Sequence, residues 1–275
     1  SLLIGKQHMN RRSFITLFVS FLLFLSCSTV PLTGRKSLSL IPSGEMLSMS
    51  YQQYGDFLKT NPLSTNQEQT AMVKRVGGRI QSAVESYFAG KGLTGQLKDY
   101  RWEVNLVESK DVNAWCMPGG KIVVYTGILP VTQTEAGLAV VMGHEVAHAV
   151  AEHGNERMSQ GLLAQLGAAG LSVALQNKPA ETKNLWMQAY SVGAQYGALL
   201  PFSRTQESEA DEIGLTFMAM AGYDPNEAVS FWQRMSQKSG GGAPPEFMST
   251  HPSDATRIAD IQKHIPEAMK YYSRK

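Results

Sequence analysis

The sequence predicts an α+β fold that is mostly helical and forms one domain. Segments with helical periodicity dominate the chain of 275 residues, whereas strand patterns are confined to residues 102–125. No internal repeat is visible, and helices outnumber strands heavily. We therefore expect a helical body that carries one small sheet.

Two segments are expected to form this sheet. Trp102, Val104 and Leu106 alternate with polar neighbours, which is typical of a half-buried strand. The second segment, Lys121 to Tyr125, is rich in β-branched residues and follows the turn Pro118-Gly119-Gly120. Everything beyond it is expected to be helical.

Two helices are expected to open with a capping box, at Thr65 with Glu68 and at Thr132 with Glu135. The expected helices cover residues 43–59, 66–89, 132–153, 156–176, 182–199, 204–221, 225–238 and 253–264. The stretch 161–175 is apolar nearly all round and rich in small residues, so we expect a buried core helix. The alternative is an element that touches a membrane or a partner.

The composition excludes a nucleic-acid-binding function. The chain has 25 Lys and Arg against 23 Asp and Glu, and three of the basic residues precede Cys27. The remaining charge is balanced and evenly spread, with no basic stripe that would follow a phosphate backbone. Hydrophobic residues make up 43% of the chain, which indicates a folded protein.

The N-terminal region has the pattern of an export signal. Arg11 and Arg12 precede an uncharged run, residues 14–26, that is shorter than the ~20 residues of a spanning helix. The run ends in Phe24-Leu25-Ser26-Cys27, which resembles a bacterial lipobox with Cys27 as the lipidated residue. The alternative is a plain cleaved signal with an incidental cysteine.

These observations predict three regions. Residues 1–27 hold upstream sequence and a signal peptide, residues 28–42 form a tether, and residues 43–275 form a single domain. A lipid anchor would place the domain in a bacterial cell envelope, facing the periplasm, most simply on the outer membrane. Cys116 is then the one cysteine without a partner, and it is expected to be a small buried residue.

The strongest motif is the pentad His144-Glu145-Val146-Ala147-His148 inside an expected helix. Two histidines four residues apart share one helix face, so both imidazoles can bind one metal ion. Glu145 lies about 100° around the helix, within reach of a water at that metal. The sequence therefore predicts a zinc site with a general base beside it.

A catalytic zinc site has three protein ligands, so one more is needed. No acidic residue occurs between Glu156 and Glu181, which excludes a carboxylate about twenty residues after the pentad. The best candidate is Glu207, with Asp211 four residues later on the same helix face. Asp211 could accept the other ring N–H of a ligand histidine. The alternative for this segment is a set of surface acids.

With these motifs the chain resembles the zinc metallopeptidases grouped with the CAAX prenyl endopeptidase and the HtpX-like heat-shock membrane proteases. The resemblance covers most of residues 45–265. It rests on four ordered motifs, namely the pentad 144–148, Asn113-Ala114 leading to Pro118-Gly119-Gly120, Ser203-Arg204 with Glu207 and Ala210-Asp211, and Thr250-His251-Pro252 with Arg257-Ile258. Trp115-Cys116-Met117 departs from the smaller residues common there, which affects only the shape of the pocket.

The resemblance implies a gluzincin endopeptidase with a minigluzincin-like core, in which a small sheet packs on the pentad helix. It implies one zinc ion held by His144, His148 and Glu207. Glu145 would be the base, and Asp211 would contact one of the zinc ligands without binding the metal itself. Because no run of membrane-spanning length occurs, the lipoprotein-type members that face the periplasm match best.

The expected reaction is hydrolysis of a peptide bond by water that Glu145 deprotonates. Residues 121–125 are expected to be an edge strand, on which an extended substrate pairs. The residues that would bind the substrate are Gly119, Gly120, Lys121, Ile122 and Val123. This mode favours unfolded or misfolded proteins, because strands of folded proteins are rarely free.

Two further residues are candidates for the site. His251 could occupy the open metal position and latch the enzyme, stabilise the oxyanion, or merely cap the helix expected from Ser253. Arg257 could bind a carboxylate or a substrate carbonyl, and the alternative is a surface salt bridge. His153 and His264 are expected to be structural.

Two functions are compatible with the sequence. The first is a lipid-anchored zinc endopeptidase that degrades unfolded or misfolded envelope proteins. The second is an envelope assembly or chaperone-like binding factor with a latched or structural zinc, whose helix at 161–175 contacts an envelope partner. Both functions require bound zinc, but only the first includes catalytic turnover of a substrate.

Overall fold

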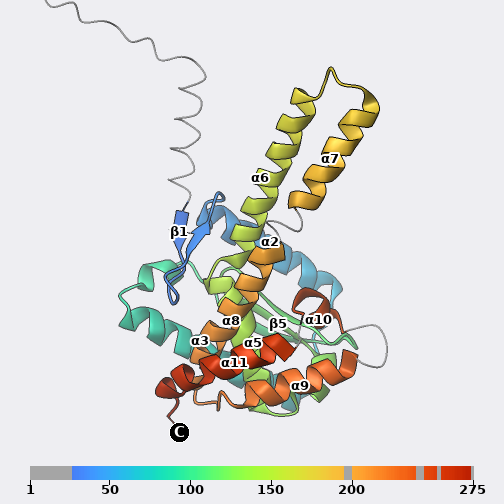
Figure 1. Ribbon diagram of the computed structural model, residues 1–275. Helices are drawn as coiled ribbons and strands as arrows, with labels where there is room; N and C mark the ends of the chain where they lie inside the picture. Colours follow the sequence, from blue (N-terminus) through green and yellow to red (C-terminus); the bar gives the residue numbers. More distant parts are fainter. Residues whose placement is uncertain (1–26, 195–199, 240–244, 253–254, 274–275) are drawn as a thin grey trace, which may run out of the picture.

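The computed structural model describes residues 27–194, 200–239, 245–252 and 255–273 (Figure 1). This part of the chain is mostly helical and carries two small sheets, which confirms the predicted α+β class. Of the region predicted to hold the signal peptide, residues 1–27, all but Cys27 lie outside the described residues.

The helices and strands follow one another along the chain as the sequence pattern predicts in outline. The α-helices are α2 (Ser43–Thr60), α3 (Gln67–Gly90), α4 (Leu129–Thr132), α5 (Glu135–Val150), α6 (His153–Ala174), α7 (Ala180–Ala194), α8 (Leu200–Met220), α9 (Glu227–Ser239), α10 (Glu246–Thr250) and α11 (Ala255–Ala268). The strands are β1 (Cys27–Thr29), β2 (Lys36–Leu38), β3 (Glu103–Val107), β4 (Ala114–Met117) and β5 (Lys121–Tyr125).

Two helix starts differ from the prediction by one or two residues. Asn66, and not Thr65, caps α3 by accepting a hydrogen bond from the backbone N–H of Gln69. Thr134, and not Thr132, caps α5 through the backbone N–H of Gly137. In both cases another side chain with an acceptor oxygen stands closer to the first helical residue.

The three-stranded sheet has the order β3-β5-β4, so β5 is its middle strand. The prediction of an edge strand at residues 121–125 is therefore wrong. The backbone of β5 pairs with parallel β3 on one side and with antiparallel β4 on the other. Gly119 and Gly120, with φ of 86° and 80°, form the tight turn that folds β4 back along β5. The edge strands of this sheet are therefore β3 and β4.

Helices α5 and α8 pack against each other at unusually short range. A Cβ atom on Gly143 would lie 2.8 Å from the carbonyl oxygen of Gly214, and one on Gly214 would lie 2.8 Å from the backbone nitrogen of His144. The backbones touch because neither position has a side chain. This contact brings the pentad of α5 next to α8.

The N-terminal hairpin, β1 and β2 with their turn, packs on the helical body. β1 pairs antiparallel with β2, and Val30 in the turn is buried. The Arg35 guanidinium donates to the carboxylates of Glu156 on α6 and Glu209 on α8. The prediction of a tether over residues 28–42 is thus wrong for this segment, because ion pairs and a buried valine hold it in place.

Helices α6 and α7 form a pair that projects away from the rest of the described chain (Figure 1). Leu166 and Val173 on α6 are 67% and 65% exposed, and Trp186 on α7 is 55% exposed. The prediction of a buried core helix at 161–175 is therefore wrong. Its small residues serve the contact with α7, where Tyr190 packs over Gly167 and donates to the carbonyl of Ala164.

Among the described helices, none combines the length and the apolar character needed to cross a bilayer.

The close contact between α5 and α8 can be tested by adding one methyl group. We expect Gly214→Ala to lower the free energy of unfolding by about 1–3 kcal/mol, because the methyl meets the backbone of α5. The control is Gly78→Ala in α3, where a Cβ meets nothing within 4 Å, so helix propensity should make the protein equally or slightly more stable. Urea unfolding of both variants measures the difference, and equal stability would contradict the described packing.

Candidate metal centre and active site

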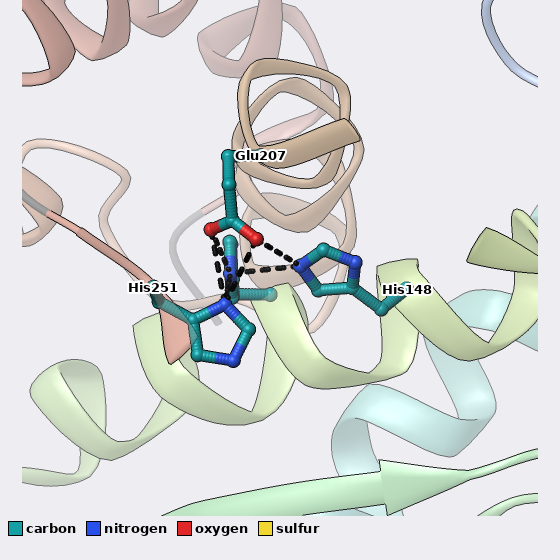
Figure 2. Close-up of side chains that lie close together, drawn as sticks. His148, Glu207 and His251 are labelled. Atoms are coloured by element: carbon teal, nitrogen blue, oxygen red, sulfur yellow. Dashed lines mark hydrogen bonds and ion pairs between the residues drawn. The ribbon is translucent and has the colours of Figure 1, made fainter. Parts of the chain in front are cut away.

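Four buried side chains converge at the junction of α5 and α8. They are His144, His148, Glu207 and His251, and one ligand atom from each lies within 4.8 Å of every other. His144 and His148 come from α5, Glu207 comes from α8, and His251 follows α10. Figure 2 shows the Glu207 carboxylate pointing from its helix toward the rings of His148 and His251.

The spacing of three of these donors fits a tetrahedral metal ion. The Nε2 atoms of His144 and His148 are 3.1 Å apart, and each lies 3.3 Å from a carboxylate oxygen of Glu207. Bonds of ~2.0–2.1 Å to zinc give a tetrahedron edge of roughly 3.3 Å. The two histidines lie one helical turn apart, as the pentad predicts.

The other ring nitrogens of both histidines have partners. His144 Nδ1 lies 2.9 Å from Asp211 Oδ1, and His148 Nδ1 lies 2.8 Å from His153 Nδ1. Donation through Nδ1 leaves both Nε2 lone pairs facing the Glu207 carboxylate, so positive charge is needed between them. Burial lowers the pKa of His144, but Asp211 and Glu207 together outweigh burial and raise this pKa to about 9. The donor set therefore suits a cation such as zinc.

Glu145 is a buried carboxylate, and one of its oxygens makes no hydrogen bond. Its Oε1 atom has no hydrogen-bond partner and lies 3.4 Å from His251 Nε2. Burial raises the pKa of Glu145 above its usual range. A carboxylate of this kind beside a metal site is suited to accept a proton.

Arg257 and Asp211 form a buried ion pair behind the donors. Arg257 donates to both oxygens of Asp211 at 2.8 Å, and its Nη1 atom lies 3.2 Å from Glu207. Its guanidinium also stacks 3.6 Å above the ring of Trp232. Burial opposes ionisation of Asp211, but Arg257 and then His144 hold its pKa below the usual range. The alternative of a surface salt bridge for Arg257 is wrong, because the residue is only 8% exposed.

His251 stands on the open side of the donor set. Its Nδ1 atom lies 3.0 Å from both oxygens of Glu207 and 3.2 Å from His144 Nε2. Its ring also packs on Phe247. The side chain thus lies where a fourth ligand would stand.

The residues predicted to bind a substrate strand are less accessible than expected. Ile122 and Val123 are buried in the middle strand, and Lys121 is held by Glu103 at 3.0 Å. The strand that borders α5 is β4, whose second edge pairs with no strand of the described chain. Sequence reasoning missed β4 because Ala114-Trp115-Cys116-Met117 is short and does not alternate.

Sequence reasoning also missed the partners of His148. His153 is completely buried between His148 and Glu209, although it was expected to be only structural. A histidine five residues after the pentad is the only signal that pointed to it. His264 lies on the surface, 3.9 Å from Glu212.

Comparisons with known proteins identify the family of the chain. The model of peptidase family M48 matches residues 75–265. The chain is 36% identical to the mitochondrial metalloendopeptidase OMA1 of Schizosaccharomyces pombe, over 89% of this chain and 68% of that protein. It is 32% identical to human OMA1, over 96% of this chain and 51% of that protein. It is 31% identical to the beta-barrel assembly-enhancing protease of Yersinia pestis, over 57% of this chain and 33% of that protein.

The ion pair between Arg257 and Asp211 gives a testable expectation for stability. We expect Arg257→Leu to lower the free energy of unfolding by about 3–5 kcal/mol, because it leaves a buried carboxylate uncompensated. Arg75→Leu is the matched control, since Arg75 pairs with Glu135 at the surface, and it should change stability little. Urea unfolding of the metal-free proteins measures both, and a small effect of Arg257→Leu would contradict the buried pair.

Proposed function

The chain belongs to peptidase family M48 and is a zinc-dependent metalloendopeptidase, and from this premise we propose that His144, His148 and Glu207 hold the zinc. Glu145 is then the general base in the hydrolysis of peptide bonds. The observation that carries the proposal is the convergence of three donors, from two helices, at tetrahedral spacing beside a buried carboxylate whose Oε1 atom makes no hydrogen bond.

The chain's own residues divide the chemical work. Zinc, when bound, supplies Lewis acidity that activates water and polarises a carbonyl. Glu145 takes the proton of the attacking water and passes it to the leaving amine, and its raised pKa suits both steps. Asp211 accepts the Nδ1–H of His144 and so fixes the tautomer that presents Nε2.

The edge strand β4 is the proposed place for the substrate. It runs beside α5, and an extended peptide could pair with its second edge and so pass the pentad. Trp115 of β4 packs edge-on against Phe57, with ring centroids 4.9 Å apart. Backbone pairing selects for extended chains more than for sequence, so we propose unfolded or misfolded envelope proteins as substrates.

The location proposed is a bacterial cell envelope, with a lipid on Cys27 and the domain facing the periplasm. One similar protein is named for beta-barrel assembly, which supports an envelope role, whereas the OMA1 proteins are named mitochondrial. β1 begins at Cys27, and its partner strand β2 contacts α6, so the proposed anchor lies near the base of the α6–α7 pair. We propose that the apolar surface of this pair contacts the membrane.

A second candidate function is an assembly or binding factor with a latched zinc. The position of His251 favours it, because four protein donors would close the metal site and leave no place for a substrate. In this case the exposed α6–α7 pair would contact an envelope partner.

The proposed base can be tested on an unfolded protein such as casein. We expect the zinc-loaded chain to cleave it and Glu145→Gln to slow cleavage by about 10²–10⁴-fold, because the amide cannot take the proton. Glu45→Gln, in the exposed first turn of α2, is the matched control and should keep the parent rate.

Cleavage that survives Glu145→Gln would show that another group is the base. A zinc-loaded parent that cleaves nothing would support the second candidate. Activity that then emerges with His251→Ala would identify this histidine as the latch.

The membrane contact can be tested by fluorescence, because Trp186 is the exposed tryptophan of the α6–α7 pair. We expect vesicles of brominated phosphatidylglycerol to quench the tryptophan fluorescence of the full chain. The substitution Trp186→Phe should remove most of that quenching. Trp102, Trp115 and Trp232 lie outside this pair, packed against the hydrophobic core, and serve as internal controls. The contact would be contradicted if the variant were quenched as much as the parent chain. It would also be contradicted if the parent bound to vesicles without any quenching.

A further inference from the structure

A chain of polar contacts leads away from His148 on the side opposite Glu207. His148 Nδ1 lies 2.8 Å from His153 Nδ1, and His153 Nε2 lies 3.0 Å from Glu209 Oε2. His153 has no exposed surface, and Glu209 is 6% exposed. Bulk water therefore cannot replace these contacts.

The chain of contacts continues into the N-terminal hairpin. Arg35 Nε donates to Glu209 at 2.7 Å, and the hydroxyl of Thr33 donates to the other oxygen of the same carboxylate. Arg35 also donates both terminal nitrogens to Glu156 at 2.8 Å, although the two residues are 121 positions apart in the sequence. Glu156 in turn accepts from the buried Gln206.

With neutral imidazoles, only one placement of hydrogens satisfies the contacts that run from His148 Nδ1 through His153 to Glu209. The Glu209 carboxylate can only accept, so His153 must donate to it through Nε2. His153 Nδ1 is then an acceptor, and His148 must carry its proton on Nδ1. The lone pair of His148 Nε2 is left to face His144 and Glu207.

The backbone is bent to make this arrangement. Helix α5 ends at Val150 and α6 begins at His153, and between them Glu152 has a φ of 57°. A left-handed conformation is uncommon for a residue other than glycine. The turn places the His153 ring within hydrogen-bond distance of His148. Apolar side chains in the same buried space would cost less desolvation free energy than this polar network.

We propose that His153, Glu209 and Arg35 are positioning residues, which hold His148 in the orientation and tautomer that bind zinc through Nε2. The N-terminal hairpin is then part of the metal site, although none of its residues touches the donors. The inference rests on the proposed ligation by His148. Loss of such an outer contact typically weakens metal binding by about 10–100-fold.

The first test measures zinc affinity of the full chain by competition with a chromogenic chelator. We expect His153→Leu to weaken binding by about 10–100-fold. His153→Gln should restore most of it, because the amide oxygen can accept from His148 while the amide nitrogen donates to Glu209. Circular dichroism of the metal-free proteins checks that both are folded. Parent affinity in folded His153→Leu overturns the proposal.

The second test asks whether the hairpin acts through His153. Arg35→Met should weaken zinc binding in the parent chain but have no further effect in His153→Leu. An equal effect in both backgrounds would mean that Arg35 acts through general folding, and it overturns the proposal. Arg75→Met removes a surface arginine that also pairs with a glutamate, and it should leave the affinity unchanged. If His153→Leu does not fold, Glu209→Gln replaces it in this comparison.

His148→Leu separates this proposal from the proposed function. If it leaves zinc affinity unchanged, His148 is not a ligand and both proposals fail. If it abolishes binding while folded His153→Leu binds zinc like the parent, the ligand assignment stands and only the positioning role is wrong.

Discussion

The contact between the backbones of α5 and α8 at Gly143 and Gly214 is the constraint on which the site depends. Both helices carry donors, and their separation decides whether Glu207 can reach the two histidines of the pentad. The elements around them support this contact. Arg257 of α11 forms an ion pair with Asp211 of α8, and β4 packs against α5.

The second constraint is the negative charge of the buried carboxylates, which two arginines from different parts of the chain neutralise. Arg257 neutralises Asp211 and Glu207 on the side of α11, while Arg35 neutralises Glu209 and Glu156 on the side of the N-terminal hairpin. Each arginine therefore pairs with a carboxylate that contacts either His144, a proposed zinc ligand, or His153, the partner of His148. Such pairs add little net stability, and their main effect is to fix the positions of the groups they join.

Short-range patterns in the sequence predict the part of the site that lies within single helices. The convergence of His144 and His148 follows from helical geometry, as does the position of Glu207 and Asp211 on one helix face. The edge position of β4 and the docking of Arg35 depend on contacts between distant segments, which no local pattern encodes. The stretch 161–175 is ambiguous for a related reason: an apolar, small-residue helix looks the same whether it packs in a core or on one neighbouring helix.

A crystal structure of the zinc-loaded chain, with anomalous data collected at the zinc edge, tests the central claim most directly. The account predicts one strong peak between Nε2 of His144, Nε2 of His148 and the Glu207 carboxylate, at bond lengths of ~2.0–2.2 Å. A peak elsewhere, or zinc that is bound without Glu207, would contradict it.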